Sequence, residues 1–192
     1  MKIQCISPID GSIYAERNIL KRSEVNYAIE SAKLAQSGWA ERSLSERISL
    51  VRAGVAAIGA MNEEIVLELA HQMGRPVRYR GEFGGFEERA NYMAKIAGEA
   101  LAPIEVEDSS EFCRKIKRIP HGLVLVVAPW NYPYMTAINT IAPALIAGNS
   151  VILKHSSQTL LVGERLEKAF HSVGIPKDVF VNVFLDHETT TQ

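Results

Sequence analysis

Two short apolar segments, separated by a stretch long enough for a helix, constrain the fold more than any other feature of this chain. Residues 123–127 are a continuous run of Leu and Val, and residues 151–153 are a second apolar run that ends at Lys154. Such runs are typical of parallel strands that are buried on both faces. Parallel strands joined by a helix run in one direction, so Asn131, just after the first strand, and Lys154 should share one sheet edge. Open α/β sheets hold ligands there.

The pattern continues toward the C-terminal end of the sequence. Residues 159–173 have the spacing of an amphipathic helix, and residues 179–184 form a third apolar run. The predicted order of strand, helix, strand, helix and strand is the half-unit of a dinucleotide-binding fold. Pro143 lies inside the first connecting helix and is expected to kink or split it.

The last residues predict the start of another helix, with Asp186 as its N-cap. A helix stopped after one turn has formed its costly nucleus without propagation. We therefore expect this chain to be a truncated part of a longer protein.

The N-terminal half is predicted to be mainly helical. Turn residues around Asp10 and Gly11 indicate a small hairpin between residues 3–6 and 13–14. The spacing of apolar residues then predicts helices at residues 23–38, 45–61, 62–74 and 83–100. In the last of these, the side chains expected to face inward are Tyr92, Met93, Ile96 and Ala97.

A charged hairpin is predicted between the helical part and the first apolar strand. Residues 104–107 alternate and carry acidic side chains, whereas residues 112–119 carry basic ones. Opposite charges on paired strands contribute a few tenths to about 1 kcal/mol per pair, which favours a solvent-exposed two-stranded ribbon. These residues alone are equally compatible with a polar hairpin that has no further role.

Composition excludes several classes of function. The 21 Lys and Arg residues balance 22 Asp and Glu, so no net field recruits nucleic acid or an anionic membrane. No apolar run approaches the roughly 20 residues of a membrane span, and a cytoplasmic protein is expected. Cys5 and Cys113 lack metal or redox spacing, and the five histidines form no ligand pair, so no metal site is predicted.

Two polar residues are candidates for chemistry. Asn131 lies on a proline-flanked turn, where its amide could donate to an oxygen that gains negative charge; the alternative is a turn asparagine that bonds its own backbone. Lys154 could donate to ribose hydroxyls or attract phosphate; the alternative is an exposed lysine that ends a strand. Cys113, in the charged hairpin, has no convergent base and is not expected to be a nucleophile.

Residues 128–133 (Ala-Pro-Trp-Asn-Tyr-Pro), followed by residues 141–154, strongly resemble the NAD(P)-dependent aldehyde dehydrogenase superfamily. The resemblance implies an α/β fold with N-terminal helices, a two-stranded ribbon and a partial Rossmann-like parallel sheet. Residues 1–103 would be the N-terminal helical part of the cofactor-binding domain. Residues 104–120 would be an oligomerisation ribbon, and residues 121–192 the first half of the Rossmann-like cofactor-binding domain.

The same resemblance implies oxidation of a small aldehyde to a carboxylic acid through a cysteine thiohemiacetal, in a homo-oligomer. Asn131 would hold the oxyanion, Lys154 the adenosine ribose, and Pro129 and Trp130 the nicotinamide side. Ser157 stands where many NAD-preferring members carry glutamate, so the cofactor is expected to be NAD or NADP, with NADP tolerated.

The family's nucleophilic cysteine and catalytic glutamate would lie downstream of residue 192, so the chain alone is predicted to be inactive. The alternative is a non-catalytic protein that kept the sheet and ribbon as an interaction or assembly surface. A stand-alone nucleotide-binding module is disfavoured because the sequence has neither GxGxxG nor GxxxxGK[ST]. A reading frame that continues into a glutamate-glycine-rich segment and a cysteine would favour the enzyme.

Overall fold

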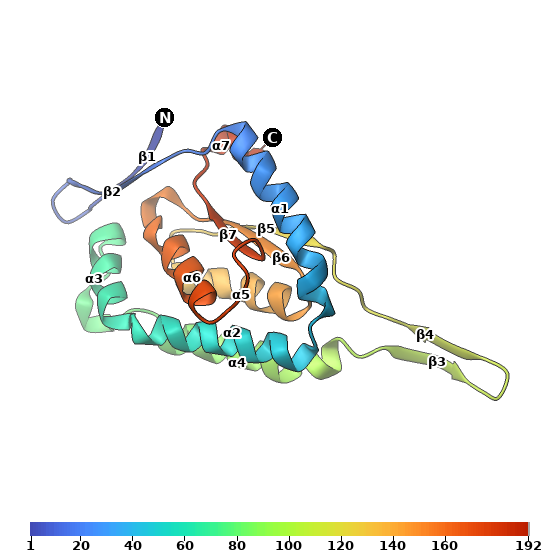
Figure 1. Cartoon of the computed structure of the whole chain (residues 1–192). Coiled ribbons are helices and arrows are strands. Elements are labelled where there is room, and N and C mark those ends of the chain that lie inside the picture. The colour runs from blue at the N-terminus through green and yellow to red at the C-terminus, as the bar shows by residue number, and fades with distance from the viewer. Residues whose placement is uncertain (192) are drawn as a thin grey trace.

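A parallel three-stranded sheet lies at the centre of the computed structural model, which describes residues 1–191 (Figure 1). Its strands are β5 (Leu123–Val127), β6 (Ser150–Lys154) and β7 (Phe180–Val183), in the order β5-β6-β7. Helix α5 (Pro133–Ile146) connects β5 to β6, and α6 (Leu161–Ser172) connects β6 to β7. The predicted βαβαβ unit is therefore confirmed.

Helices cover the two faces of this sheet unequally (Figure 1). On one face, α5 and α6 pack on the strands, and α2 (Leu44–Ala60) and α4 (Phe83–Ala100) pack behind them. On the other face lies α1 (Arg22–Glu41), with a small apolar cluster beneath it. Helix α3 (Asn62–Met73) and the 3-10 turn η1 (Val77–Tyr79) lead from α2 to α4.

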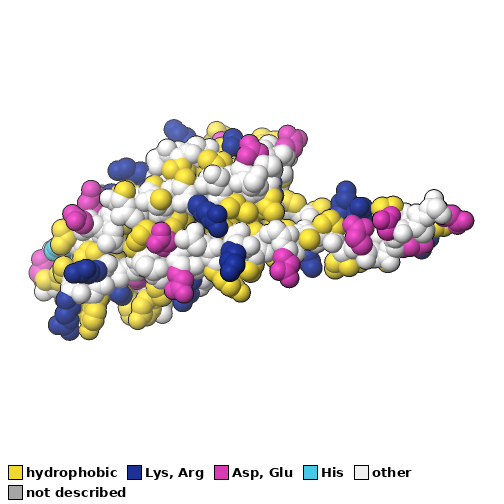
Figure 2. Space-filling model, turned by 90° about the horizontal axis from the view of Figure 1, so that it is seen from below, with side chains coloured by type: hydrophobic (Ala, Val, Ile, Leu, Met, Phe, Trp, Pro, Cys, Tyr) yellow, Lys and Arg dark blue, Asp and Glu magenta, His cyan; other side chains and the backbone are white. Residues whose placement is uncertain are grey.

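Two antiparallel hairpins complete the structure. Strands β1 (Lys2–Ile6) and β2 (Ile13–Asn18) pair at the N-terminus, as predicted. Strands β3 (Ile104–Asp108) and β4 (Cys113–Ile116) form the predicted ribbon, which projects from the body (Figures 1 and 2). Ion pairs join Glu107 to Arg114 at 3.1 Å and Glu105 to Lys115 at 3.4 Å across the ribbon.

Asp186 caps the final helix α7 (His187–Thr191), as predicted, by accepting the Thr189 backbone N–H at 2.8 Å. Helix α4 has the predicted bounds, but its predicted inward face is partly wrong. Ala97 is buried, whereas Tyr92 is 62% exposed and Ile96 is 37% exposed. The core contacts lie instead along a row of small residues and one aromatic ring, Phe86, Ala90, Ala94 and Ala97.

The first two helices also differ from prediction at their ends. Gly38 does not end α1, which runs on to Glu41. Helix α2 is capped by Ser43, two residues before the predicted start, and Ser43 and Glu46 form a reciprocal capping box. A single glycine within a helix weakens it without breaking it, and the burial of Trp39 in the core stabilises α1 beyond Gly38.

The prediction that the first apolar strand is buried on both faces is wrong. Val126 is buried, but Leu125 and Val127 are 53% and 58% exposed, because β5 is an edge strand and α1 does not cover them. The central strand β6 is buried throughout. Pro143 was expected to kink or split the first connecting helix; it does not split it, since α5 continues across it as one helix. The missing N–H leaves the carbonyl of Asn139 without its helical donor, at a residue that is exposed to water.

Candidate functional site

The carboxyl ends of β5 and β6 bring the two candidate residues to one sheet edge. Val127 pairs with Lys154 in the parallel register, and the Ala128 N–H donates to the Lys154 carbonyl at 3.1 Å. The chain then turns through residues 129–132 into α5. Asn131 and Lys154 thus both follow strand ends at this edge, where the sequence places them.

The turn that carries Asn131 has an unusual backbone. Tyr132 adopts a left-handed conformation, with φ 47° and ψ 53°, and Pro133 begins α5 directly after it. The Tyr132 carbonyl accepts from the Thr136 N–H at 2.9 Å and from the Thr136 hydroxyl at 2.8 Å. A left-handed tyrosine is held at an energetic cost of about 1 kcal/mol or more, so the turn is fixed by its surroundings.

Asn131 itself is exposed. Within the described residues, its hydrogen bonding is limited to the backbone carbonyl, 3.5 Å from the Thr136 hydroxyl. The alternative of an asparagine that bonds its own backbone therefore does not apply. Its amide group is free to donate to a ligand.

Asn131 lines an open hollow of about 550 Å³. One wall is the turn from Trp130 to Tyr132, and the other is the segment from Met73 to Pro76 with Tyr79. Trp130 is 53% exposed there, and the Arg75 guanidinium lies 5.6 Å from the centroid of the Tyr132 ring. The hollow joins an apolar surface to a free amide, as a site for a small polar-headed substrate requires.

Lys154 is buried, with 6% of its surface exposed, so it is not the exposed lysine of the alternative interpretation. Burial lowers the pKa of its ammonium group. No salt bridge joins it to an acidic side chain within residues 1–191, and its Nζ is not among the buried polar atoms that lack a partner, so the ammonium group is accessible at the sheet edge. The group can therefore serve hydroxyl or phosphate oxygens of a ligand, which fits a dinucleotide.

The loop after Lys154 leads to Ser157, the first residue of the 3-10 turn η2 (Ser157–Thr159). Ser157 is half-buried and Pro129, across the edge, is exposed. Between Lys154 and Ser157 lies His155, whose Nδ1 accepts from the Ser156 N–H at 2.9 Å. Its Nε2 then carries the proton and lies 3.5 Å from the Pro133 carbonyl, which links this loop to the start of α5.

Glu82 is a contributor to this edge that the sequence analysis missed. It is 4% exposed, and its Oε2 accepts the backbone N–H groups of Tyr134 and Met135 at 3.1 Å each. Burial raises the pKa of this carboxyl, although both hydrogen bonds and Arg75 act to lower it. No sequence motif marks such a residue, because it acts on a helix 52 positions away.

Neither cysteine lines the hollow beside Asn131. Cys5 is buried in β1, donates to the Gln158 carbonyl at 3.0 Å, and has a pKa that burial raises to about 11. Cys113 is exposed on the ribbon. Among residues 1–191, no group of three or more His, Cys, Asp or Glu side chains could hold a metal ion. No helix in the described part of the chain is long and apolar enough to cross a membrane.

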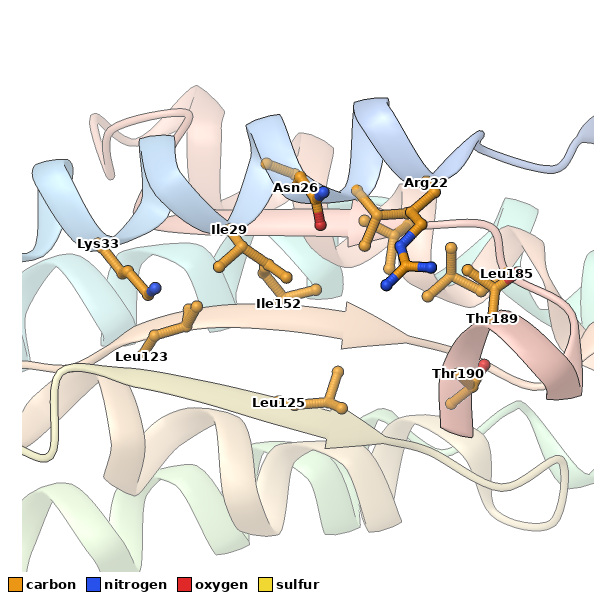
Figure 3. A pocket seen from close by; sticks show the side chains of 13 residues that line it. Arg22, Asn26, Ile29, Lys33, Leu123, Leu125, Ile152, Leu185, Thr189 and Thr190 are labelled. Carbon is orange, nitrogen blue, oxygen red and sulfur yellow. The ribbon is translucent and has the colours of Figure 1, made fainter. Parts of the chain in front are cut away.

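A second hollow, of about 460 Å³, lies between α1, the exposed face of the sheet and α7 (Figure 3). Leu123, Leu125 and Ile152 form its floor, and Ile29 faces them from α1. Among the described residues that line it, Arg22 and Lys33 are charged. Its described lining residues include no carboxylate, histidine or cysteine, and neither Asn131 nor Lys154 lies in it, so the Asn131 edge remains the candidate site.

Comparison with known proteins identifies the relatives of this chain. The model of the aldehyde dehydrogenase family matches residues 1–192. A D-glyceraldehyde dehydrogenase (NADP(+)) of Picrophilus torridus is 32% identical over 92% of this chain and 36% of its own length. A benzaldehyde dehydrogenase [NAD(+)] of Pseudomonas putida is also 32% identical, over 91% of this chain and 36% of its own length.

Solved structures agree. The NADP-dependent glyceraldehyde-3-phosphate dehydrogenase of Bacillus halodurans, complexed with NADP, is 28% identical with a TM-score of 0.89. The match covers 98% of this chain and 41% of that one. The chain therefore spans about two fifths of the length of its relatives, among which both NAD- and NADP-dependent enzymes occur.

Proposed function

Because this chain belongs to the aldehyde dehydrogenase family, we propose that it forms one wall of the active site of an NAD(P)-dependent enzyme that oxidises a small aldehyde to a carboxylic acid. The observation that carries the proposal is that a free Asn131 amide and Lys154, which has no ion-pair partner among residues 1–191, lie at the same sheet edge. These groups match the two charge demands of the reaction, a developing oxyanion and an anionic cofactor.

Asn131 has the role of an oxyanion donor. Attack of a thiolate on the aldehyde carbon breaks the carbonyl π bond and leaves negative charge on the oxygen, and an amide N–H donor fixed beside it stabilises that charge. When bound, the oxidised nicotinamide ring accepts the hydride that leaves the same carbon. Removal of one such donor slows chemistry by about 100- to 1,000-fold.

Lys154 and Ser157 have the role of a half-site for the cofactor, with Pro129 and Trp130 on the nicotinamide side. The Lys154 ammonium can donate to ribose hydroxyls or a phosphate, and the burial of its aliphatic stem holds it at the sheet edge. Ser157 places no negative charge beside the ribose, so a 2′-phosphate is not repelled and both NAD and NADP are accepted.

The attacking thiolate and the carboxylate that activates water are supplied from outside residues 1–192. Cys5 stays protonated because its pKa is about 11, and Cys113 lies on the ribbon. The chain by itself therefore has no aldehyde oxidation activity. Formation of reduced nicotinamide cofactor by the pure 192-residue chain, measured by absorbance, would contradict this.

The proposal also assigns a part to each segment of the chain. Residues 1–103 form the helical part of the cofactor-binding domain, and residues 121–192 form the first half of its Rossmann-like sheet. Residues 104–120 form a ribbon through which copies of the full-length protein associate. Its projection from the body and its paired charges support this use.

Titration of the 192-residue chain with NAD and NADP tests the half-site. Lys154→Ala should raise the dissociation constants of both NAD and NADP by about tenfold, because one charge-assisted contact is lost. Ser157→Glu should weaken NADP binding by about tenfold more than NAD binding. Lys168→Ala, at an exposed lysine of α6, is the matched control. A large NAD preference in the wild type would reject the role given to Ser157.

The oxyanion role is tested in an aldehyde-oxidising polypeptide that contains residues 1–192. Asn131→Ala should lower kcat by about 100-fold or more with little change in the cofactor KM. Asn139→Ala, at an exposed asparagine on α5, is the control and should leave kcat unchanged. Equal activity of both variants would remove Asn131 from the mechanism.

A further inference from the structure

Helix α5 starts without a cap of its own. Its N-cap residue is Tyr132, which makes no side-chain hydrogen bond to the first turn. The first backbone N–H groups of a helix have no partner inside it and need an acceptor when water is excluded. Tyr134 is 2% exposed, so its N–H cannot depend on bulk water.

Glu82 supplies the missing acceptor from another part of the chain. Its Oε2 receives the N–H groups of Tyr134 and Met135, both at 3.1 Å, and its side chain is 1% exposed. The positive end of α5 favours a carboxylate at this point. Arg75, with Nη1 at 3.8 Å from Glu82 Oε1, adds a second positive group.

The same two side chains flank the turn that carries Asn131. Arg75 donates to the Gly81 carbonyl at 2.8 Å, just before Glu82, and its guanidinium lies over the Tyr132 ring. Tyr132 is the left-handed residue between Asn131 and the capped turn of α5. Release of the cap would allow Tyr132 to relax to a common conformation and would move Asn131 with it.

We propose that Glu82 is a positioning residue for Asn131: it anchors the first turn of α5 and so fixes the strained turn that presents the Asn131 amide. The inference rests on the proposed function only for the consequence in catalysis. It differs from a general stabilising role because it predicts a local effect on one turn. Glu82 does not line the hollow beside Asn131 and takes no direct part in the reaction.

The local effect is measured by NMR on the 192-residue chain. Glu82→Ala should speed amide hydrogen exchange at Tyr134 and Met135 by about tenfold or more and shift the Asn131 side-chain amide resonance. Glu82→Gln keeps one oxygen acceptor and loses the charge. In this variant, amide exchange at Tyr134 and Met135 should be about fivefold faster than in wild type. Glu88→Gln, at an exposed glutamate on α4, should change neither readout.

If Glu82→Ala fails to fold, Glu82→Gln decides. Unchanged exchange at Tyr134 and Met135, or an unmoved Asn131 resonance, overturns the inference. A merely structural role would accelerate exchange across α4 and α5 together, whereas the positioning role confines the change to the first turn of α5 and residues 130–132.

The catalytic consequence is measured in an aldehyde-oxidising polypeptide that contains this chain. Glu82→Ala should lower kcat by about 10- to 100-fold, because small displacements of a catalytic group have effects of that size. The cofactor KM should stay within about twofold, and Glu82→Gln should recover most of the rate. A fall in kcat for Asn131→Ala but not for Glu82→Ala overturns the inference and leaves the proposed function standing. If the NMR effects are observed but the polypeptide oxidises no aldehyde, the positioning role of Glu82 stands and the proposed function is rejected.

Discussion

The two faces of the central sheet differ in how completely they are covered. On the α5 and α6 face, large side chains such as Phe170, Phe180 and Leu153 are fully buried, and α2 and α4 form a further layer. On the α1 face, Leu125 and Val127 remain more than half exposed, and the second hollow lies between part of α1, the sheet and α7 (Figure 3). The residues that fix the candidate site, Glu82 and His155, both contact the start of α5. The covered face thus determines the geometry of the site.

The largest difference in stability between the two faces is expected when a core side chain on the covered face is truncated. Phe170→Ala should lower the free energy of unfolding by about 3–5 kcal/mol, because the ring packs against Gly54 and lies 5.0 Å from the Phe180 ring. Urea unfolding followed by circular dichroism measures this. A loss below about 1 kcal/mol would mean that the covered face is no tighter than the open one.

Acid should act on the covered face through His155. Burial lowers the pKa of this imidazole from 6.5 to about 4, so the folded state binds the proton more weakly than the unfolded chain. The resulting stability is present above pH 6.5 and is lost as the pH falls toward 4, by about 3 kcal/mol.

The comparison of His155→Gln with wild type across this range isolates that contribution, because the slopes of other groups, including Glu82, cancel. The variant should lose less stability in acid. His121→Gln, at an exposed histidine, is the control and should follow wild type. Parallel pH profiles for wild type and His155→Gln would show that His155 is readily protonated in the folded state.

On the open side, replacement of Gly38 in α1 by alanine should stabilise the protein. A Cβ added at Gly38 meets no atom within 4 Å, whereas one added at Gly54 would lie 2.3 Å from Phe170 Cδ1. Gly38→Ala should therefore raise the free energy of unfolding by about 0.5–1 kcal/mol through helix propensity alone. Gly54→Ala should lower it. Thermal unfolding of both variants compares the faces, and equal signs would contradict the difference.

The smallest effect is expected at the exposed floor of the second hollow. Leu125→Thr removes apolar surface that is already 53% exposed and keeps a strand-forming residue, so stability should change by about 0.5 kcal/mol or less. The same change should reduce concentration-dependent association, because an apolar edge strand invites pairing. Sedimentation velocity measures the association. A loss of stability near that of Phe170→Ala would show that another element covers Leu125.

The sequence predicted elements well where local patterns decide them. The bounds of α4 and β5 follow from periodicity and from the flanking turn residues, and Asp186 and Gly74 mark helix ends by their own chemistry. Tyr92 and Ile96 were misplaced because helical spacing does not say which of two apolar stripes meets a neighbour. Similarly, a strand of Leu and Val does not reveal that it lies at an edge.

The residues of the candidate site likewise fall into those that the sequence predicted and those that it did not. Asn131 and Lys154 could be found because parallel strand ends converge whatever the side chains do. Glu82 could not be found, because its partners lie 52 and 53 residues away and its type is common on helix surfaces. The burial of Lys154 and His155 likewise depends on how α5 and the β6 loop pack together, which no short motif encodes.

The two tryptophans of this chain, one buried in α1 and one half-exposed beside Asn131, have a practical consequence. Trp39 donates to the Leu145 carbonyl at 2.9 Å and is 1% exposed, whereas Trp130 is 53% exposed. A collisional quencher such as acrylamide should therefore extinguish the emission of Trp130 and spare that of Trp39. The molecule thus carries two optical probes of its own, one for the integrity of the core and one for occupancy of the site.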